Sequence, residues 1–356
     1  MIAPIALRSV LHSDIEYVKH GFPCICPSKE GSWPVMRQVY SHELEWFKAA
    51  DGFQLWFYDP GGCMCERCRR DLCGPLVRQA EEFSRLAWGK NPCAEFQVSM
   101  WPIWEWEARL GRRYGVELLD RLRSCFAENH RQIAIVDSAE VPGSFLDAAK
   151  GRGFRTQAFL FSADVETPFV FLNPQFGYLR ETAARIAAKG YDGGLLHSLS
   201  PGSKMLSTLA GALALWNPRS SEDELAQATA VRFTGEETAA RQLAPVLRKW
   251  EKLLLDGNPG AEAGGHLRRE VEKVMSRLPE ESRRRMEPIL DSARAIEVLA
   301  AAAAAKHDSA RQRELAVRFR VVLEASPTFR AFAAQGAAEF PHLVEWMTIG
   351  WKGRHF

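Results

Sequence analysis

The chain has 356 residues, of which 46% are hydrophobic, and its 46 Lys and Arg side chains nearly balance its 44 Asp and Glu side chains. This composition is typical of a globular protein that is large enough to bury a sizeable core without disulfide bonds. A formal net charge of +2 provides no basic field for nucleic acid or for an anionic membrane, so we expect neither partner.

Six short apolar runs in the first part of the chain predict buried strands. They are residues 22–26, 53–59, 95–101, 132–138, 155–161 and 193–198. Continuous apolar runs are typical of strands that are buried on both faces of a parallel sheet. The stretches between the runs have helical periodicity and capping signals. Strands that alternate with helices predict either a (β/α) barrel or a doubly wound sheet.

Of these two α/β folds, we favour a (β/α)8-type, TIM-like barrel over residues 1–217. Six strands are fewer than the eight of such a barrel, and residues 1–21 add one element at most. We therefore expect a barrel that is incomplete at its N-terminal side.

The composition changes after residue 217. All eight Cys and eight of the eleven Trp lie before that residue, and the remainder is rich in Ala, Arg, Glu and Leu. Residues 218–356 are expected to form an all-α domain whose first helix is capped by Ser221. Further helices are expected at 234–257, 266–277, 280–306, 308–325 and 328–347. These helices offer a face for a homo-oligomer, but they lack the sustained heptads that would commit them to one.

Candidate ligand-binding residues follow the predicted strands, because ligands bind at the C-terminal ends of parallel strands. The polar and aromatic residues at these ends are Tyr58, Asp59, Trp101, Trp104, Glu105, Trp106, Asp137 and His197. Carboxylates beside indole rings suit sugars, whose hydroxyl groups bond to the acids while their C–H faces stack on the rings. The alternatives are structural: each acid could cap a helix, the indoles could plug the barrel mouth, and the histidine could be a satisfied strand-end residue.

Four of the eight cysteines lie between residues 63 and 73. Cys63, Cys65 and Cys68 have a spacing that lets three thiolates converge on one tetrahedral ion, with Cys73, Cys24 or Cys26 as the fourth ligand. Four thiolates would make a structural zinc site, since a catalytic zinc keeps one position open. The alternative is that these are buried, reduced thiols that behave as small hydrophobic residues.

This density of thiols favours metal binding in a reducing compartment over a disulfide framework. The sequence also has no apolar run near the roughly 20 residues of a membrane span and no secretion signal at its start. We therefore expect a cytoplasmic protein with no membrane partner.

The segment around these cysteines, WFYDPGGCMCERC at 56–68, resembles a strand-end segment of bacterial barrel proteins related to the β-hexosaminidase and α-glucuronidase glycoside hydrolases. Residues 172–198 and 212–239 are similar to the way such proteins end the barrel and enter a helical domain. The resemblance covers roughly residues 50–240 and implies a glycosidase-like scaffold. One departure is that relatives often place a carboxylate just after the serine of the last strand, where this chain has Leu199 after Ser198.

A glycoside hydrolase needs one protonated acid and one carboxylate, and no cofactor for the chemistry. We expect Asp59 and Asp137 to form this pair, with Glu105 as a substitute for either. Tyr58, Trp101, Trp104 and Trp106 would raise the pKa of one acid by desolvation, and His197 would hold a sugar hydroxyl.

The rival hypothesis is a non-catalytic protein that binds a glycan or acts as a scaffold, with a loop clamped by zinc or thiols. The missing acid after Ser198 and the shortage of strands favour it. A metal-dependent hydrolase ranks last, because the chain has no His-x-His or His-Glu-x-x-His motif.

Overall fold

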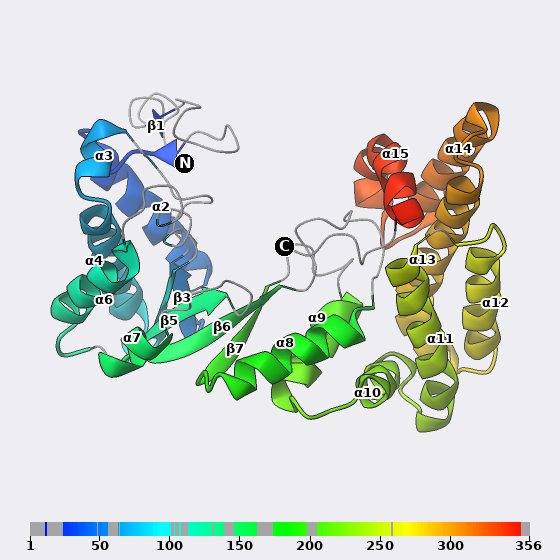
Figure 1. Cartoon of the computed structure of the whole chain (residues 1–356), viewed down its shortest axis with the longest axis horizontal. Helices are drawn as coiled ribbons and strands as arrows, with labels where there is room; N and C mark the ends of the chain where they lie inside the picture. Colours follow the sequence, from blue (N-terminus) through cyan, green and yellow to red (C-terminus); the bar gives the residue numbers. More distant parts are fainter. Residues whose placement is uncertain are drawn as a thin grey trace. The chain divides into compact units, whose positions relative to one another are not determined.

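Helices predominate over strands in this protein (Figure 1). The computed structural model describes residues 11–12, 24–47, 49–55, 63, 65–100, 103, 107, 113–129, 132–138, 146–161, 174–197, 205–257 and 259–349. Within these ranges, no helix combines the length and the apolar character that crossing a bilayer requires.

Five strands form one sheet in the order in which they occur in the chain, β3-β4-β5-β6-β7. Their bounds are Gly52–Leu55, Glu95–Ser99, Ile133–Ser138, Arg155–Phe161 and Gly193–His197. The pairs β3–β4, β4–β5 and β5–β6 are parallel, with Phe53 opposite Phe96 and Phe96 opposite Ile133. Parallel strands in chain order, joined by crossovers of one hand, place their connecting helices on one face of the sheet.

The prediction of an eight-stranded (β/α)8 barrel is wrong. In the part of the chain that the structure describes, the parallel sheet has the five strands named above, in the order of a barrel wall but without closure. The first predicted strand, residues 22–26, instead contributes β2 (Cys24–Ile25), which pairs antiparallel with β1 (Leu11–His12). Pro27 has no amide hydrogen with which to continue a ladder, and a turn replaces the strand there.

The helices of the N-terminal half cover the apolar face of β3, β4 and β5. These helices are α2 (Ser32–Trp46), α4 (Cys73–Lys90), α6 (Tyr114–Cys125) and α7 (Leu146–Gly151). The short helix α3 (Glu66–Arg70) contributes Cys68 to a separate cluster of cysteines. Phe53, Phe96 and Ile135 pack in one buried cluster with Phe83 of α4 and Leu119 of α6. The apolar positions of the strands and the helical periodicity between them thus form the core that the sequence predicts.

The opposite face of β4 is polar. Glu95 accepts hydrogen bonds from Gln97 at 2.9 Å and from Gln157 at 2.7 Å, and it forms an ion pair with Arg155. Alternation along a strand puts these side chains on the face away from Phe96 and Val98. Burial on both faces, which the apolar runs predicted, therefore holds in β5, where Ile133 to Asp137 are all buried, and not in β4.

The helical C-terminal region confirms the prediction closely. After α8 (Phe176–Ala188) and α9 (Met205–Trp216) come six further helices in the described residues. They are α10 (Glu222–Thr234), α11 (Glu237–Asp256), α12 (Ala263–Met275), α13 (Glu280–Ala304), α14 (Ser309–Ala325) and α15 (Ala333–Ile349), with a short 3-10 turn, η3 (Arg330–Phe332), before the last. Ser221 caps α10 as predicted, because its hydroxyl accepts from the Glu224 amide at 3.2 Å while the Glu224 side chain accepts from the Ser221 amide at 2.7 Å.

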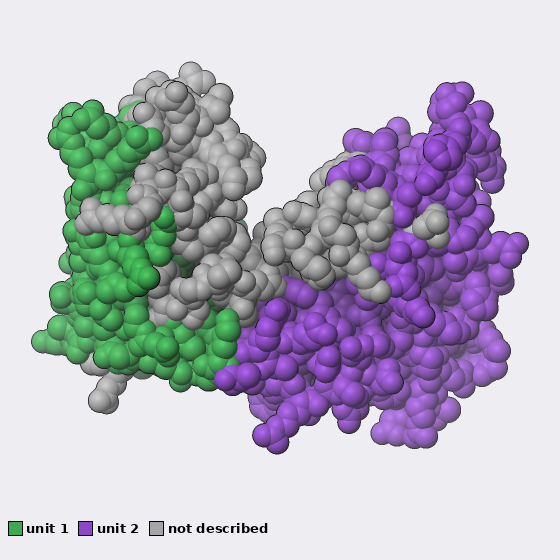
Figure 2. Space-filling model, viewed as in Figure 1, with its two compact units in different colours: residues 1–159, 189–195 green, residues 160–188, 196–356 purple. Residues whose placement is uncertain are grey.

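Contacts divide the chain into two compact units (Figure 2). The first consists of Met1–Phe159 and Lys189–Leu195, and the second of Leu160–Ala188 and Leu196–Phe356. The second unit contains α8 and α9 as well as the helices from α10 onward, because α9 packs against both α8 and α10.

Candidate metal centre

Four cysteine side chains converge in the first unit. They are Cys26, directly after β2, then Cys63 and Cys65 before α3, and Cys68 within α3. Their sulfur atoms all lie within 4.8 Å of one another. The Cys26 sulfur is 3.9 Å from that of Cys65 and 3.8 Å from that of Cys68.

Local backbone structure presents these sulfurs to one point. On one side, a turn follows Cys26, because the Lys29 amide donates to the Cys26 carbonyl at 3.1 Å. The buried Ser32 hydroxyl donates to the same carbonyl at 2.5 Å and ties the turn to the start of α2. On the other side, Cys65 precedes α3, and the Arg69 amide donates to its carbonyl at 2.9 Å, so that Cys68 lies on the same helical turn.

The site is largely closed to solvent. Cys26 is 1% exposed, Cys68 2% and Cys63 5%, and Cys65 is partly buried against them. Burial raises the pKa of Cys26 to about 11. A hydrogen bond with Cys63, together with burial, raises the pKa of Cys68 above its ordinary range. Without an ion these two thiols are protonated near neutral pH, and a divalent cation would displace their protons on binding.

The spacing of the sulfurs fits a single ion. A tetrahedral zinc ion with Zn–S bonds of about 2.3 Å holds its four sulfurs about 3.8 Å apart. The distances from the Cys26 sulfur to those of Cys65 and Cys68, 3.9 and 3.8 Å, agree with that geometry. An iron–sulfur cluster places several iron and sulfide ions between its thiolates and needs a wider spacing. The described cysteines form no disulfide bond, so all four sulfurs are available as ligands.

Three of the four predicted metal ligands, Cys63, Cys65 and Cys68, belong to this group, and the fourth member is Cys26. Cys73 lies elsewhere, at the start of α4. Its thiol donates to the Tyr114 carbonyl at 3.7 Å, and its side chain packs in the large hydrophobic cluster. It behaves there as the small hydrophobic residue that the alternative hypothesis described. The side chain of Cys24 lies outside the described residues.

The predicted carbohydrate site is described only in part. Tyr58, Asp59, Trp101, Trp104, Glu105 and Trp106 lie outside the described residues, and so does the side chain of His197, whose backbone ends β7. Asp137 is 5% exposed near the carboxyl end of β5, where it pairs in register with Ala158. The pairing of Asp59 with Asp137 therefore stays a prediction. Strand alternation puts Asp137 on the side of Ile133 and Ile135, which the helices cover, and this favours a structural role for it.

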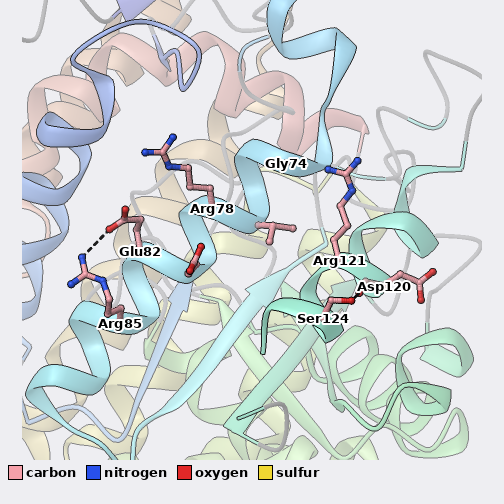
Figure 3. A pocket seen from close by; sticks show the side chains of 9 residues that line it. Gly74, Arg78, Glu82, Arg85, Asp120, Arg121 and Ser124 are labelled. Carbon is pink, nitrogen blue, oxygen red and sulfur yellow. Dashed lines mark hydrogen bonds and ion pairs between the residues drawn. The ribbon is translucent and has the colours of Figure 1, made fainter. Parts of the chain in front are cut away.

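A groove of about 580 Å³ lies between α4 and α6, and none of the predicted site residues lines it (Figure 3). Its charged groups neutralise one another. Arg85 donates to Glu82 at 2.9 Å, and Arg121 donates to Asp71 at 2.9 Å. The guanidinium of Arg78 stacks 4.0 Å above the Trp33 ring. The groove therefore offers no unbalanced charge that would select a ligand.

Two residues of the metal centre were not predicted from the sequence, Ser28 and Ser32. The Ser28 hydroxyl oxygen lies 3.1 Å from the Cys68 sulfur, and Ser32 holds the turn at Cys26. Serine is too common in turns for its presence near a cysteine to signal this role.

No model of a protein family matches this chain, and no curated protein matches its sequence significantly. The function is therefore proposed from the chemistry of the site.

Proposed function

We propose that this protein binds one zinc ion through the thiolates of Cys26, Cys63, Cys65 and Cys68, and that the ion has a structural role. The observation that supports this most directly is the convergence of four sulfurs within 4.8 Å, three of them on buried residues. Four thiolates fill a tetrahedral ion completely, so no position remains for a substrate or a water molecule. The ion would therefore hold the chain together and take no part in catalysis.

The proposed ion joins two segments that are distant in the sequence. Cys26 and Cys65 are separated by 39 positions, and α2 and β3 lie between them. Residues 56–62 connect the carboxyl end of β3 to Cys63 and contain Tyr58 and Asp59. The proposed ion would fix the end of this segment that adjoins Cys63. A structural ion next to this segment would restrict the conformations open to the part of the chain that bears the candidate acid.

Metal analysis tests this proposal directly. Protein purified without chelator is expected to contain one zinc per chain, and replacement of Cys63, Cys65 or Cys68 by serine is expected to abolish stoichiometric zinc. Cys93→Ser and Cys125→Ser are matched controls, because both thiols are exposed and lie outside the cluster. A wild-type chain without affinity for zinc, or equal metal content in all five variants, would contradict the proposal.

Glycoside hydrolysis is the second candidate function. It is supported by the resemblance of residues 56–68, in which Asp59 precedes Cys63 by four residues, to a strand-end segment of barrel proteins related to glycoside hydrolases. In this proposal Asp59 and Asp137 serve as the acid and the nucleophile or base, with Glu105 as a substitute for either, and the substrate is a carbohydrate or glycoside. The alternative is a non-catalytic protein that binds a glycan or acts as a scaffold.

Activity on a panel of aryl glycosides separates these alternatives. An active enzyme is expected to lose at least about 100-fold in kcat on Asp59→Asn, since general acid–base catalysis contributes at least that much. Asp147→Asn, a change in the first turn of α7, is the matched control. Binding of an oligosaccharide without hydrolysis would support the non-catalytic alternative and overturn the hydrolase.

A further inference from the structure

The Ser28 hydroxyl contacts a sulfur of the candidate metal centre. Its oxygen lies 3.1 Å from the Cys68 sulfur, although the two residues are 40 positions apart in the sequence. Ser28 is half-buried and Cys68 is 2% exposed, so little water competes for this sulfur. A contact of this length between a hydroxyl and a sulfur is a hydrogen bond.

The backbone holds this hydroxyl in place. Ser28 lies inside the turn that the amide of Lys29 closes onto the carbonyl of Cys26, and Pro27 restricts the backbone before it. The Ser32 hydroxyl donates to the same carbonyl. The turn that presents the Cys26 sulfur therefore presents the Ser28 hydroxyl as well, and neither group needs to reorganise when an ion binds.

The direction of the hydrogen bond follows from the state of the sulfur. A thiol can donate or accept, whereas a metal-bound thiolate has no proton and can only accept. Four thiolates on a divalent ion also carry a net charge of −2 in a buried site, and a hydrogen-bond donor stabilises that charge. The Ser28 hydroxyl is positioned to be this donor.

We propose that Ser28 is a positioning residue of the metal centre, whose hydroxyl donates a hydrogen bond to the metal-bound Cys68 thiolate and thereby raises metal affinity and withdraws electron density from that sulfur. This inference rests on the proposed zinc site. Ser28 does not contact the ion itself, so its effect on the ion is transmitted through the Cys68 sulfur alone.

The full-length protein loaded with Co²⁺ or with iron gives measurements that are sensitive to the electron density on the Cys68 sulfur. In Ser28→Ala, we expect the affinity for Co²⁺ to fall about 10-fold, as is usual when an outer-shell hydrogen bond is lost. The sulfur-to-cobalt charge-transfer band should move to lower energy, because a more electron-rich sulfur gives up an electron more easily. For the same reason, the reduction potential of the iron-loaded variant should fall.

Two variants control for structure. Ser28→Thr keeps the hydroxyl and should restore the band position. Ser84→Ala on α4 loses a hydroxyl that donates to the Glu81 carbonyl and lies outside the cysteine group, so it should leave the band energy unchanged even where it lowers stability. The energy of the charge-transfer band is measured on the folded protein that has bound cobalt, so it does not depend on how much of the protein folds.

The outcomes distinguish this inference from the zinc site itself. A wild-type chain that binds no Co²⁺ overturns the metal centre. A wild-type chain that binds Co²⁺, with Ser28→Ala unchanged in affinity, band energy and iron potential, overturns the role of Ser28 and leaves the centre standing.

Discussion

The sulfur of Cys26 lies 3.8 Å from the sulfur of Cys68, and 42 sequence positions separate the two residues. The helix α2 and the strand β3 lie between them, so their proximity depends on the tertiary fold and not on a local motif. Protonated thiols attract one another only weakly, whereas thiolates on one ion are strongly bound. The contact is therefore a place where a bound ion would add stability.

Metal removal is expected to destabilise the first unit. A ligand that binds only the folded chain adds about 4 kcal/mol when its free concentration is 1,000 times its dissociation constant. We expect a zinc chelator to lower the midpoint of thermal unfolding, and added zinc to restore it. Calorimetry of loaded, stripped and reloaded protein measures both changes, and identical midpoints in all three would contradict a structural ion.

Cys26 and Cys73 are expected to respond differently to replacement by serine. Cys26→Ser removes one of four thiolates and should lower zinc affinity by more than about 100-fold, beyond the effect of an outer-shell change. Cys73→Ser places a hydroxyl among apolar side chains and should cost about 1 to 3 kcal/mol of stability while full zinc binding remains. Zinc titration and denaturant unfolding of both variants check this, and the reverse pattern would make Cys73 the fourth ligand.

Stability at low pH should depend on Glu82 of α4. Two hydrogen bonds from Arg37, at 2.9 and 2.7 Å, are the main reason that the pKa of Glu82 falls from its ordinary 4.5 to about 2. Because the folded-state pKa is the lower one, this stabilisation is complete above pH 4.5 and is lost as the pH falls towards 2. At neutral pH, Glu82→Gln should lower the free energy of unfolding by about 1 kcal/mol.

The pH dependence provides the check on Glu82. The difference in unfolding free energy between wild type and Glu82→Gln should shrink between pH 4.5 and pH 2. Glu66→Gln is the matched control, since Glu66 pairs with Arg70 in a fully surface-exposed contact on α3 and should change stability little at any pH. A difference for Glu82→Gln that stays constant across this range would argue against the ion pair with Arg37.

The elements were predictable where local pattern decides them. Apolar runs and caps predicted five strands of the sheet and the helices of the C-terminal region, because periodicity and capping by residues such as Ser221 are local properties. Closure of a barrel was not predictable in the same way, since it depends on pairing between strands far apart in the chain. The run at 22–26 has a strand's composition, yet the structure pairs it with β1 in a separate sheet.

Three of the four cysteines of the candidate metal centre could be predicted from the sequence. The spacing of Cys63, Cys65 and Cys68 specifies their convergence, because two of them lie on one turn at the start of α3. The fourth cysteine of the group comes from a distant segment, and Cys24 and Cys26 both belong to the predicted strand at 22–26, so the sequence does not choose between them. Proximity in the sequence favoured Cys73, but the amphipathic helix α4 buries it against Tyr114 instead.

A buried carboxylate, Glu251, links two helices of the second unit. Its side chain accepts a hydrogen bond at 2.8 Å from the Gly177 amide in the first turn of α8, and it also pairs with Arg248 on its own helix, α11. Glu251 is 2% exposed, and burial raises its pKa, so its charge depends on these two partners. Loss of the carboxylate leaves the partly buried Gly177 amide without its acceptor and Arg248 without its most buried partner.

We therefore expect Glu251→Ala to lower the free energy of unfolding of this unit by about 3 kcal/mol, as is usual when one partner of a buried pair is removed. Glu237→Ala on the same helix is the matched control, because Glu237 is 76% exposed and forms a surface ion pair with Arg241. It should change stability by less than about 0.5 kcal/mol. Chemical denaturation of both variants measures the two costs, and equal values would show that the contact between α8 and α11 contributes nothing beyond a surface ion pair.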